Sequence, residues 1–176
     1  MILLRHAPVM QNGLCYGSFE IPVQEVAHTT LSALKTQWEK MGSPSVVSSP
    51  ASRCLKLAQT LVQESGATVI SDPRLREMNF GTWEGRPWSE LPRAETEIWT
   101  NDWETQRPPQ GETYSEIRTR VLASAAEWFH RDANAWFVTH AGPIRILLAQ
   151  QRGLSPAQSI SIPVPYLTPL DWEAKQ

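Results

Sequence analysis

Five charged or titratable side chains stand at expected strand ends or in turns, and their types suit the binding of an anion. Arg5 and His6 follow an apolar run at the start of the chain, and His140 follows another such run. Arg53 lies in the first turn of an expected helix, and Glu77 lies in the segment after an expected strand. The planar guanidinium group of arginine matches phosphate oxygens and stays charged. Two arginines and two histidines around one point would contact a tetrahedral anion from several sides.

Phosphoryl transfer is the chemistry that these residue types favour. It requires a nucleophile, a proton donor for the leaving oxygen and neutralisation of the phosphoryl charge. The sequence has no Walker-type glycine loop with lysine, no acidic cluster for magnesium and no Cys-x5-Arg loop. A neutral imidazole held in one tautomer can attack phosphorus, so the available nucleophile is a histidine. Neither histidine has a second ligand at i+4, and nearby arginines would repel a cation. We therefore expect neither a metal nor a cofactor.

The proton donor and the role of Arg53 are open at this stage. Glycines and aromatic residues flank Glu77, and a carboxylic acid in a partly apolar pocket suits proton transfer. A solvated glutamate is the usual alternative, and Glu84 in the same segment is an equal candidate. A helix N-terminus disfavours a cation, so Arg53 taken alone is expected to point into solvent. The sharper alternative is that Arg53 and the helix end share an anionic ligand.

Hydrophobic periodicity predicts the elements that must position these side chains. A first strand ends at Arg5 and His6, and Thr113 with Glu116 forms an expected capping box. The remaining predictions are helices over 24–41, 51–65, 113–131 and 143–151, strands over 45–50, 67–71, 136–139, 159–162 and 166–172, and an irregular and helical cover at about 78–112. This order predicts an α/β fold, a three-layer α/β/α sandwich with a mostly parallel sheet and an antiparallel edge strand. Ligands of such sheets bind at the carboxyl ends of the strands.

Length and composition narrow the function class. A chain of 176 residues is expected to form a single domain over 1–176. The net charge of −2 argues against a nucleic-acid partner. No signal-like or membrane-length apolar run occurs in the sequence, so we expect a soluble, cytoplasmic protein without a membrane partner. Cys15 and Cys54 are expected to be free thiols. The sequence does not fix the oligomeric state, and a homodimer is one alternative.

Five segments of the sequence, in order, resemble the histidine phosphatases, the phosphoglycerate mutase-like superfamily. They are Leu4-Arg5-His6-Ala7 with Asn12 after it, Ser48-Ser49-Pro50-Ala51-Ser52-Arg53-Cys54, the acid loop Leu75 to Gly85, Gly111-Glu112-Thr113, and Thr139-His140-Ala141-Gly142. The departures are Ala7 and Ala141, which stand where the family usually has glycine. Because both residues are small, we expect tighter packing beside each histidine and retained activity.

The resemblance implies a role for each matched residue. His6 would be phosphorylated and then dephosphorylated, while Arg5, Arg53 and His140 would hold the phosphoryl oxygens. Glu77 would protonate the leaving alcohol and then help to deprotonate the hydrolytic water. Asn12 would add a hydrogen bond to the substrate. No metal or other cofactor would be needed, because the arginines supply the positive charge.

A further resemblance concerns the substrate, which is expected to be a small phosphate ester. Gly13-Leu14-Cys15-Tyr16-Gly17 and Ile21-Pro22-Val23 are similar to a stretch of the α-ribazole phosphatases, although Glu20 replaces the expected aspartate and Val26-Ala27-His28 the usual helix start. This similarity implies α-ribazole 5′-phosphate as the substrate, in cobalamin biosynthesis. Tyr16 and Trp83 are the aromatic candidates for substrate contact, and core packing is the alternative for the tryptophans. The small cover argues against a mutase.

Two other functions compete with this hypothesis. One is a phosphatase of broad specificity for sugar phosphates, nucleotides or phosphoproteins. The other is a phosphate-binding module without turnover, against which the presence of all five candidate residues argues.

Overall fold

A five-stranded sheet forms the centre of the computed structural model, which describes residues 1–174. The strands β1 (Ile2–Arg5), β2 (Val46–Ser48), β3 (Val69–Ser71), β4 (Trp136–Thr139) and β5 (Leu170–Asp171) lie in the order β3-β2-β4-β1-β5. The first four strands run parallel, and β5 pairs with β1 in the antiparallel direction. The predicted mostly parallel sheet with an antiparallel edge strand is confirmed.

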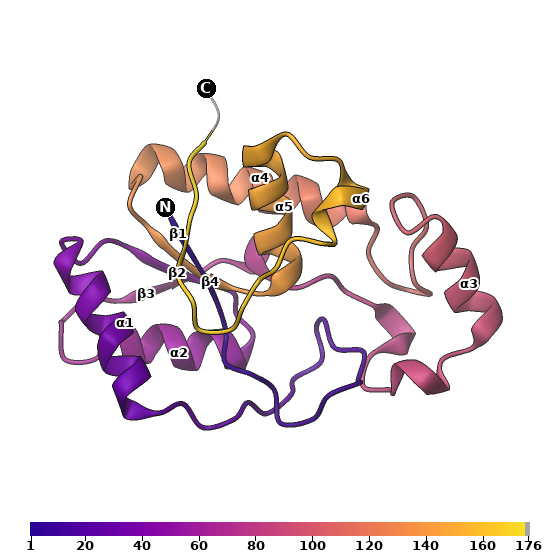
Figure 1. Ribbon diagram of the computed structural model, residues 1–176, viewed down its shortest axis with the longest axis horizontal. Coiled ribbons are helices and arrows are strands. Elements are labelled where there is room, and N and C mark those ends of the chain that lie inside the picture. Colours follow the sequence, from indigo (N-terminus) through magenta and orange to yellow (C-terminus); the bar gives the residue numbers. More distant parts are fainter. Residues whose placement is uncertain (175–176) are drawn as a thin grey trace.

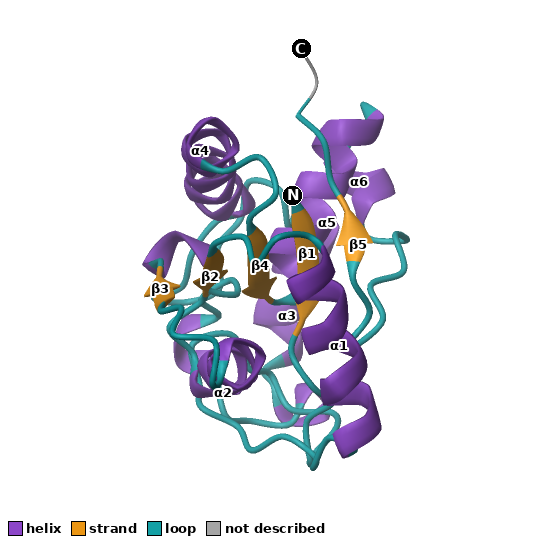
Figure 2. Cartoon of the chain, turned by 90° about the vertical axis from the view of Figure 1, so that its left-hand side faces the viewer, coloured by secondary structure: helices purple, strands orange, loops and turns teal. Residues whose placement is uncertain are grey.

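Helices cover both faces of the sheet (Figures 1 and 2). Helices α4 (Tyr114–Arg131) and α5 (Ala141–Arg152) pack on the face that carries Leu3, Val47 and Phe137. Helices α1 (His28–Lys40) and α2 (Ser52–Val62) pack on the other face, which carries the next residues along the strands, such as Leu4 and Val138. Successive residues of a strand point to opposite faces, so short apolar strands supply two cores. The predicted three-layer arrangement is therefore confirmed.

Local signals account for several of the helix boundaries. The capping box of α4 forms as predicted: Thr113 Oγ1 accepts from the backbone N–H of Glu116, whose side chain accepts from the backbone N–H of Thr113. Helix α5 begins at Ala141, two residues before the predicted start at Pro143. Helix α1 begins at His28, four residues after the predicted start at position 24.

The prediction of two strands near the C-terminus was largely wrong. The segment predicted as the first of them begins at the end of helix α6 (Pro156–Ser159), which a second capping box between Ser155 and Gln158 initiates. Of the second predicted strand, only Leu170–Asp171 pairs with β1. Leu167 has a φ of 55°, so the backbone turns at that residue and cannot continue an extended strand.

The cover, residues 78–112, contains two short 3₁₀ turns and helix α3 (Arg93–Asn101). Trp83, Trp99, Phe80 and Trp88 pack together, with ring centroids of Trp83 and Trp99 5.8 Å apart and those of Phe80 and Trp88 5.4 Å apart. In Figure 1, α3 lies to one side of the sheet, at a distance from the other helices. Phe80 and Trp99 also pack against the main core, and the ring of Trp103 lies 4.8 Å from that of Tyr114 on α4, so aromatic packing anchors the cover to the rest of the chain.

Three further observations concern the chemistry of the chain as a whole. Cys15 and Cys54 are both buried free thiols, as predicted. No helix within residues 1–174 is long and apolar enough to cross a membrane. In the same part of the chain, no group of three or more His, Cys, Asp or Glu side chains is placed to hold a metal ion.

Candidate active site

The two histidines lie side by side because β1 and β4 are neighbouring parallel strands. Arg5 pairs with Thr139 in register, and the backbone N–H of His6 donates to the carbonyl of Thr139 at 3.1 Å. The chain therefore places His6 and His140 at the same edge of the sheet, with ring centroids 5.2 Å apart. Both side chains are only 1% exposed.

The imidazole of His6 is oriented by its own backbone neighbour. Nδ1 lies 2.7 Å from the carbonyl oxygen of Ala7. A carbonyl can only accept, so Nδ1 carries the proton and Nε2 keeps its lone pair. Burial, together with the charges of Arg53 and Arg5, lowers the pKa of His6 to about 3. The ring is thus neutral at physiological pH, with a nucleophilic nitrogen on the side away from Ala7.

His140 is also held as a neutral ring. Its Nε2 lies 2.8 Å from the hydroxyl of Ser49, which in turn accepts from the backbone N–H of Ala51 at 3.3 Å. Nε2 also lies 3.5 Å from Cys54 Sγ, so Ser49 and Cys54 hold the ring at this nitrogen. Burial and the charge of Arg53 hold the pKa of His140 well below its ordinary value. His140 is therefore an uncharged imidazole beside the His6 ring.

Arg53 is buried, so the expectation from its position at a helix start, that it points into solvent, is wrong. It is 1% exposed, and its Nη1 and Nη2 donate to the carbonyls of Phe19 at 3.0 Å and Gly17 at 2.8 Å. These carbonyls come from the loop after β1, and they offset the cost of burying the guanidinium. Its Nε is buried and has no hydrogen-bond partner within residues 1–174.

Arg5 is held in a similar way from the C-terminal segment. Its Nη1 donates to the carbonyl of Val164 at 2.8 Å, and its guanidinium carbon lies 3.6 Å from the ring centroid of Tyr166. Its Nε is likewise buried without a partner among the described residues. Neither Arg5 nor Arg53 forms an ion pair with a carboxylate in this part of the chain. The two guanidinium groups therefore leave positive charge beside His6 that an anion can neutralise.

The structure separates the two candidate glutamates. Glu77 lines the cavity beside His6, and its carboxylate accepts from the backbone N–H of Gly142 at 3.0 Å and from that of Met78 at 3.0 Å. A Cβ at position 142 would lie only 2.0 Å from Glu77 Oε1, so this approach requires glycine. These contacts place the Glu77 carboxyl group beside the start of α5.

Glu84 instead binds backbone groups of two loops. Its carboxylate accepts from the backbone N–H of Ser18 at 2.8 Å, of Phe80 at 2.9 Å and of Phe19. All of its observed contacts tie the loop after β1 to the acid loop. Glu77 is therefore the candidate proton donor.

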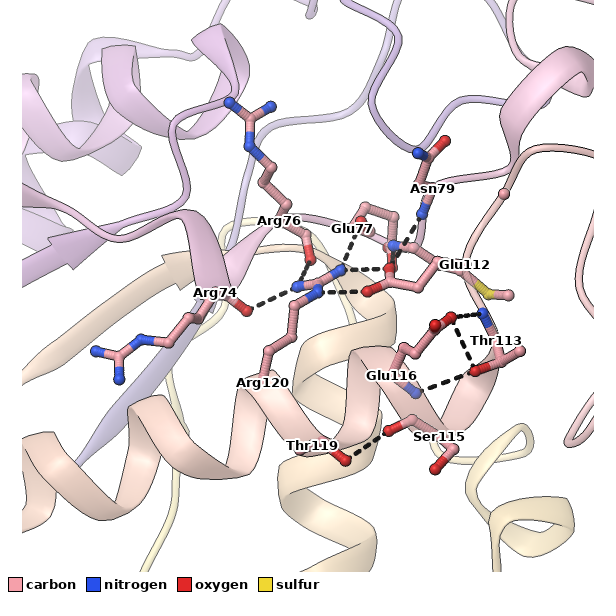
Figure 3. A network of polar contacts seen from close by, with 12 residues as sticks. Arg74, Arg76, Glu77, Asn79, Glu112, Thr113, Ser115, Glu116, Thr119 and Arg120 are labelled. Atoms are coloured by element: carbon pink, nitrogen blue, oxygen red, sulfur yellow. Dashed lines mark hydrogen bonds and ion pairs between the residues drawn. The ribbon is translucent and has the colours of Figure 1, made fainter.

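Arg120 on α4 fixes the backbone of the acid loop (Figure 3). Its guanidinium binds both carboxylate oxygens of Glu112 at 2.7 Å and also donates to the carbonyls of Arg74 at 2.7 Å, Arg76 at 2.8 Å and Glu77 at 3.0 Å. The planar guanidinium group of Arg120 thus connects α4 to the end of the cover and to the acid loop. The position of Glu77 depends on this contact.

We expect Arg120→Lys to lower kcat about tenfold and to lower stability by about 1–3 kcal/mol, because lysine keeps the charge but cannot span these acceptors. The measurements are steady-state phosphatase kinetics and thermal unfolding. Arg118→Lys on the same helix is the matched control, since the only side-chain hydrogen bond of Arg118 among the described residues goes to Gln150. Unchanged kcat in Arg120→Lys would contradict a role for Arg120 in positioning Glu77.

A cavity of about 560 Å³ opens beside His6 and Glu77. Arg5, Gly142 and Arg145 also line it, while most of its wall consists of the apolar and aromatic residues Leu14, Tyr16, Met78, Phe80, Trp88, Trp99, Trp103, Tyr114, Ile117, Ile146 and Ile160. Burial raises the pKa of the Tyr16 hydroxyl to about 12, so this group is a neutral donor in the wall. The cavity has room for an organic group joined to a phosphate at His6.

Four predicted substrate-binding residues are not part of the cavity wall: Arg53 and His140, which are buried, and Asn12 and Trp83, which lie elsewhere. Asn12 is exposed on the loop after β1 and is not part of the cavity wall. Trp83 is 1% exposed inside the cover, where its indole Nε1 donates to Glu95 at 2.9 Å. Trp83 therefore packs the cover, as the core alternative predicts, and Trp88, Trp99 and Trp103 supply the aromatic wall. Of the predicted aromatic contacts, Tyr16 lies in the wall.

Comparison with known proteins settles the family. The chain matches the histidine phosphatase superfamily (branch 1) over residues 1–175. This protein belongs to that superfamily. Its phosphoglycerate mutase-like fold agrees with the solved structures that it resembles.

Relatives of the chain within the superfamily have different names. The protein called "Probable phosphoglycerate mutase GpmB" from Yersinia pestis (strain Pestoides F) is 28% identical over 160 residues, which is 86% of this chain and 74% of that protein. The α-ribazole phosphatase structure from Shigella flexneri is 25% identical, with a TM-score of 0.84 over 96% of this chain and 87% of that one. A mycobacterial glucosyl-3-phosphoglycerate phosphatase structure is 26% identical, with a TM-score of 0.74 over 90% of this chain and 82% of that one.

Sequence reasoning missed several residues that shape this histidine phosphatase site. Ser49, Arg120, Arg145 and Tyr166 all contact the candidate residues or line the cavity. Ser49 stands within the segment that carries the family resemblance, so a local signal was present. The other three approach from distant parts of the chain, and no local pattern distinguishes them from surface residues.

Proposed function

We propose that this histidine phosphatase superfamily member is a metal-independent phosphomonoesterase that acts through a phosphohistidine. The observation that carries the proposal is the state of His6: neutral, proton on Nδ1, lone pair on Nε2, and unpaired guanidinium nitrogens of Arg5 and Arg53 nearby. This combination supplies both a nucleophile and neutralising charge for a phosphate.

The proposed reaction has two steps. In the first, His6 Nε2 attacks phosphorus, the P–O bond to the alcohol breaks, and the Glu77 carboxyl group gives its proton to the leaving oxygen. In the second, the Glu77 carboxylate takes a proton from water, the water oxygen bonds to phosphorus, and the P–N bond breaks. Throughout both steps, Arg5, Arg53 and His140 would hold the phosphoryl oxygens. The Glu77 carboxyl group acts as the acid in the first step and as the base in the second, so one acid–base residue is enough.

For the substrate, we propose α-ribazole 5′-phosphate, in cobalamin biosynthesis. The stretch from Gly13 to Val23 is similar to α-ribazole phosphatases, and the Shigella flexneri structure of that name shares the fold at a TM-score of 0.84. The wall formed by Tyr16, Trp88, Trp99 and Trp103 suits a planar ring, because aromatic faces and edges pack against such a group. A phosphatase of broad specificity is the alternative within the same chemistry.

Phosphate release in the presence of EDTA tests this proposal. The panel contains α-ribazole 5′-phosphate, ribose 5-phosphate, nucleoside monophosphates, a phosphopeptide and 3-phosphoglycerate, and isomerisation of 3-phosphoglycerate is followed in parallel. Preference for α-ribazole 5′-phosphate supports the full proposal, whereas activity spread over the panel supports broad specificity. Isomerisation without phosphate release would favour the activity named for the Yersinia relative. No phosphate release and no isomerisation with any substrate would favour a phosphate-binding module without turnover.

A further inference from the structure

A third arginine, Arg145, lies in the wall of the cavity and takes no part in the proposed reaction. It follows Gly142 by one turn of α5, so the two residues share a face of that helix. Its Nε donates to the carbonyl of Ile162 at 3.1 Å, which fixes the guanidinium from one side. Its two terminal nitrogens have no hydrogen-bond partner among residues 1–174.

The surroundings of Arg145 leave its charge incompletely compensated. Arg145 is half-buried and forms no ion pair among the described residues. Burial lowers the pKa of its guanidinium, with the charge of Glu77 opposing this shift and that of Arg5 adding to it. Trp99 lines the same cavity, and its indole Nε1 is also buried without a partner in the described chain. The wall thus contains donors on Arg145 and Trp99 that have no partner among the described residues, so a ligand with oxygen acceptors would supply the missing hydrogen bonds.

The position of Arg145 points to the alcohol half of a substrate rather than to its phosphate. Glu77 accepts a hydrogen bond from the backbone N–H of Gly142, one turn before Arg145 on α5, and Glu77 and Arg145 line the same cavity. Glu77 is the residue that would protonate the ester oxygen. A group beside Glu77 and within the cavity wall therefore lies next to the leaving alcohol.

We propose that Arg145 determines specificity by donating hydrogen bonds to an oxygen on the alcohol half of the substrate, close to the ester. The inference rests on the proposed phosphatase function and adds a substrate class to it, namely phosphate esters of sugars or hydroxy acids over those of plain alkyl alcohols. The acceptor is a hydroxyl or ring oxygen in the first group and a carboxylate in the second.

The test compares Arg145→Met with the wild type on three esters: ribose 5-phosphate, 3-phosphoglycerate and n-pentyl phosphate. Pentyl phosphate has no acceptor apart from its phosphate. We expect Arg145→Met to lower kcat/KM for at least one oxygenated ester by about tenfold to a hundredfold, which is the usual effect of losing a charged hydrogen-bond donor. The kcat/KM for pentyl phosphate should stay within about threefold of the wild-type value. Loss on ribose 5-phosphate identifies a neutral acceptor, and loss on 3-phosphoglycerate a carboxylate.

Two controls guard against an indirect effect. Arg152→Met removes an exposed charge from the end of the same helix and should change none of the three values. The inhibition constant for inorganic phosphate should be the same in Arg145→Met and the wild type, because Arg5 and Arg53 are intact.

Equal losses on all three esters, or no loss on any, would overturn the role of Arg145. Absence of wild-type turnover on these three esters and on α-ribazole 5′-phosphate would instead contradict the phosphatase function. In that case, the affinities of ribose 5-phosphate, 3-phosphoglycerate and inorganic phosphate for both proteins decide the question: at least one of the two esters, but not inorganic phosphate, should bind more weakly to Arg145→Met, and any other pattern rejects the proposal.

Discussion

Replacing His6 by asparagine should lower kcat for phosphate release by about 10⁴-fold or more, because the variant has no nucleophilic nitrogen in place of Nε2. An asparagine amide can still donate a hydrogen bond to the carbonyl of Ala7, which accepts from Nδ1–H of His6 in the wild type. The low pKa of His6 means that the wild-type nucleophile is present over the neutral and mildly acidic range. The loss should therefore appear at every pH in that range.

Chemical trapping adds a second readout for His6. Rapid acid-free quenching of wild-type enzyme with radiolabelled substrate should yield a protein-bound phosphate that is stable in base and labile in acid, as a phosphohistidine is. His6→Asn should give none while still binding inorganic phosphate. His28→Asn is the matched control, since His28 is exposed at the start of α1. Turnover within about tenfold of the wild type in His6→Asn would refute the mechanism.

Replacing Glu77 by glutamine should lower kcat for alkyl phosphates by about 10² to 10⁴-fold, the usual contribution of a general acid. The loss in the first step should be smaller for p-nitrophenyl phosphate, because its leaving phenolate needs no proton. The second step still lacks its base, so a burst of nitrophenolate followed by slow turnover is expected in Glu77→Gln. Rapid-mixing absorbance measurements would reveal this burst.

Glu84→Gln separates the two glutamates. The carboxylate of Glu84 accepts from three backbone N–H groups, so this variant should lose about 1–3 kcal/mol of stability while kcat changes much less than in Glu77→Gln. Thermal unfolding and kinetics on the same preparations provide the comparison. Full activity in Glu77→Gln together with a large loss in folded Glu84→Gln would assign the proton donor to Glu84.

Short-range patterns were sufficient for much of the architecture. Apolar runs that end at Arg5 and at Thr139 predicted two parallel strands, and register then brings His6 beside His140 without further information. The capping box at Thr113 fixed the start of α4 because both partners lie within one helical turn. A second capping box, at Ser155, begins helix α6, whose last residue is the first residue of the strand predicted over 159–162.

The choice between competing roles depended on contacts across the chain. Helix position alone favoured an exposed Arg53. The Arg53 guanidinium is instead buried, because it donates hydrogen bonds to the carbonyls of Gly17 and Phe19, more than thirty residues earlier in the chain. Likewise, Asn12 and Trp83 match the expected residue types but face solvent and the interior of the cover. Residue type sets what a side chain can do, but its neighbours decide where it points.

By itself, the sequence determined the fold class, the strand-end placement of Arg5, His6 and His140, and the chemistry that these residue types favour. Hydrophobic periodicity and strand register are local or nearly local properties, so they can be read along the chain. Only the tertiary structure distinguished Glu77 from Glu84, through the N–H of Gly142, and brought Arg120 and Arg145 to the site. Those decisions arise from hydrogen bonds and burial between segments dozens of residues apart, and no local pattern encodes them.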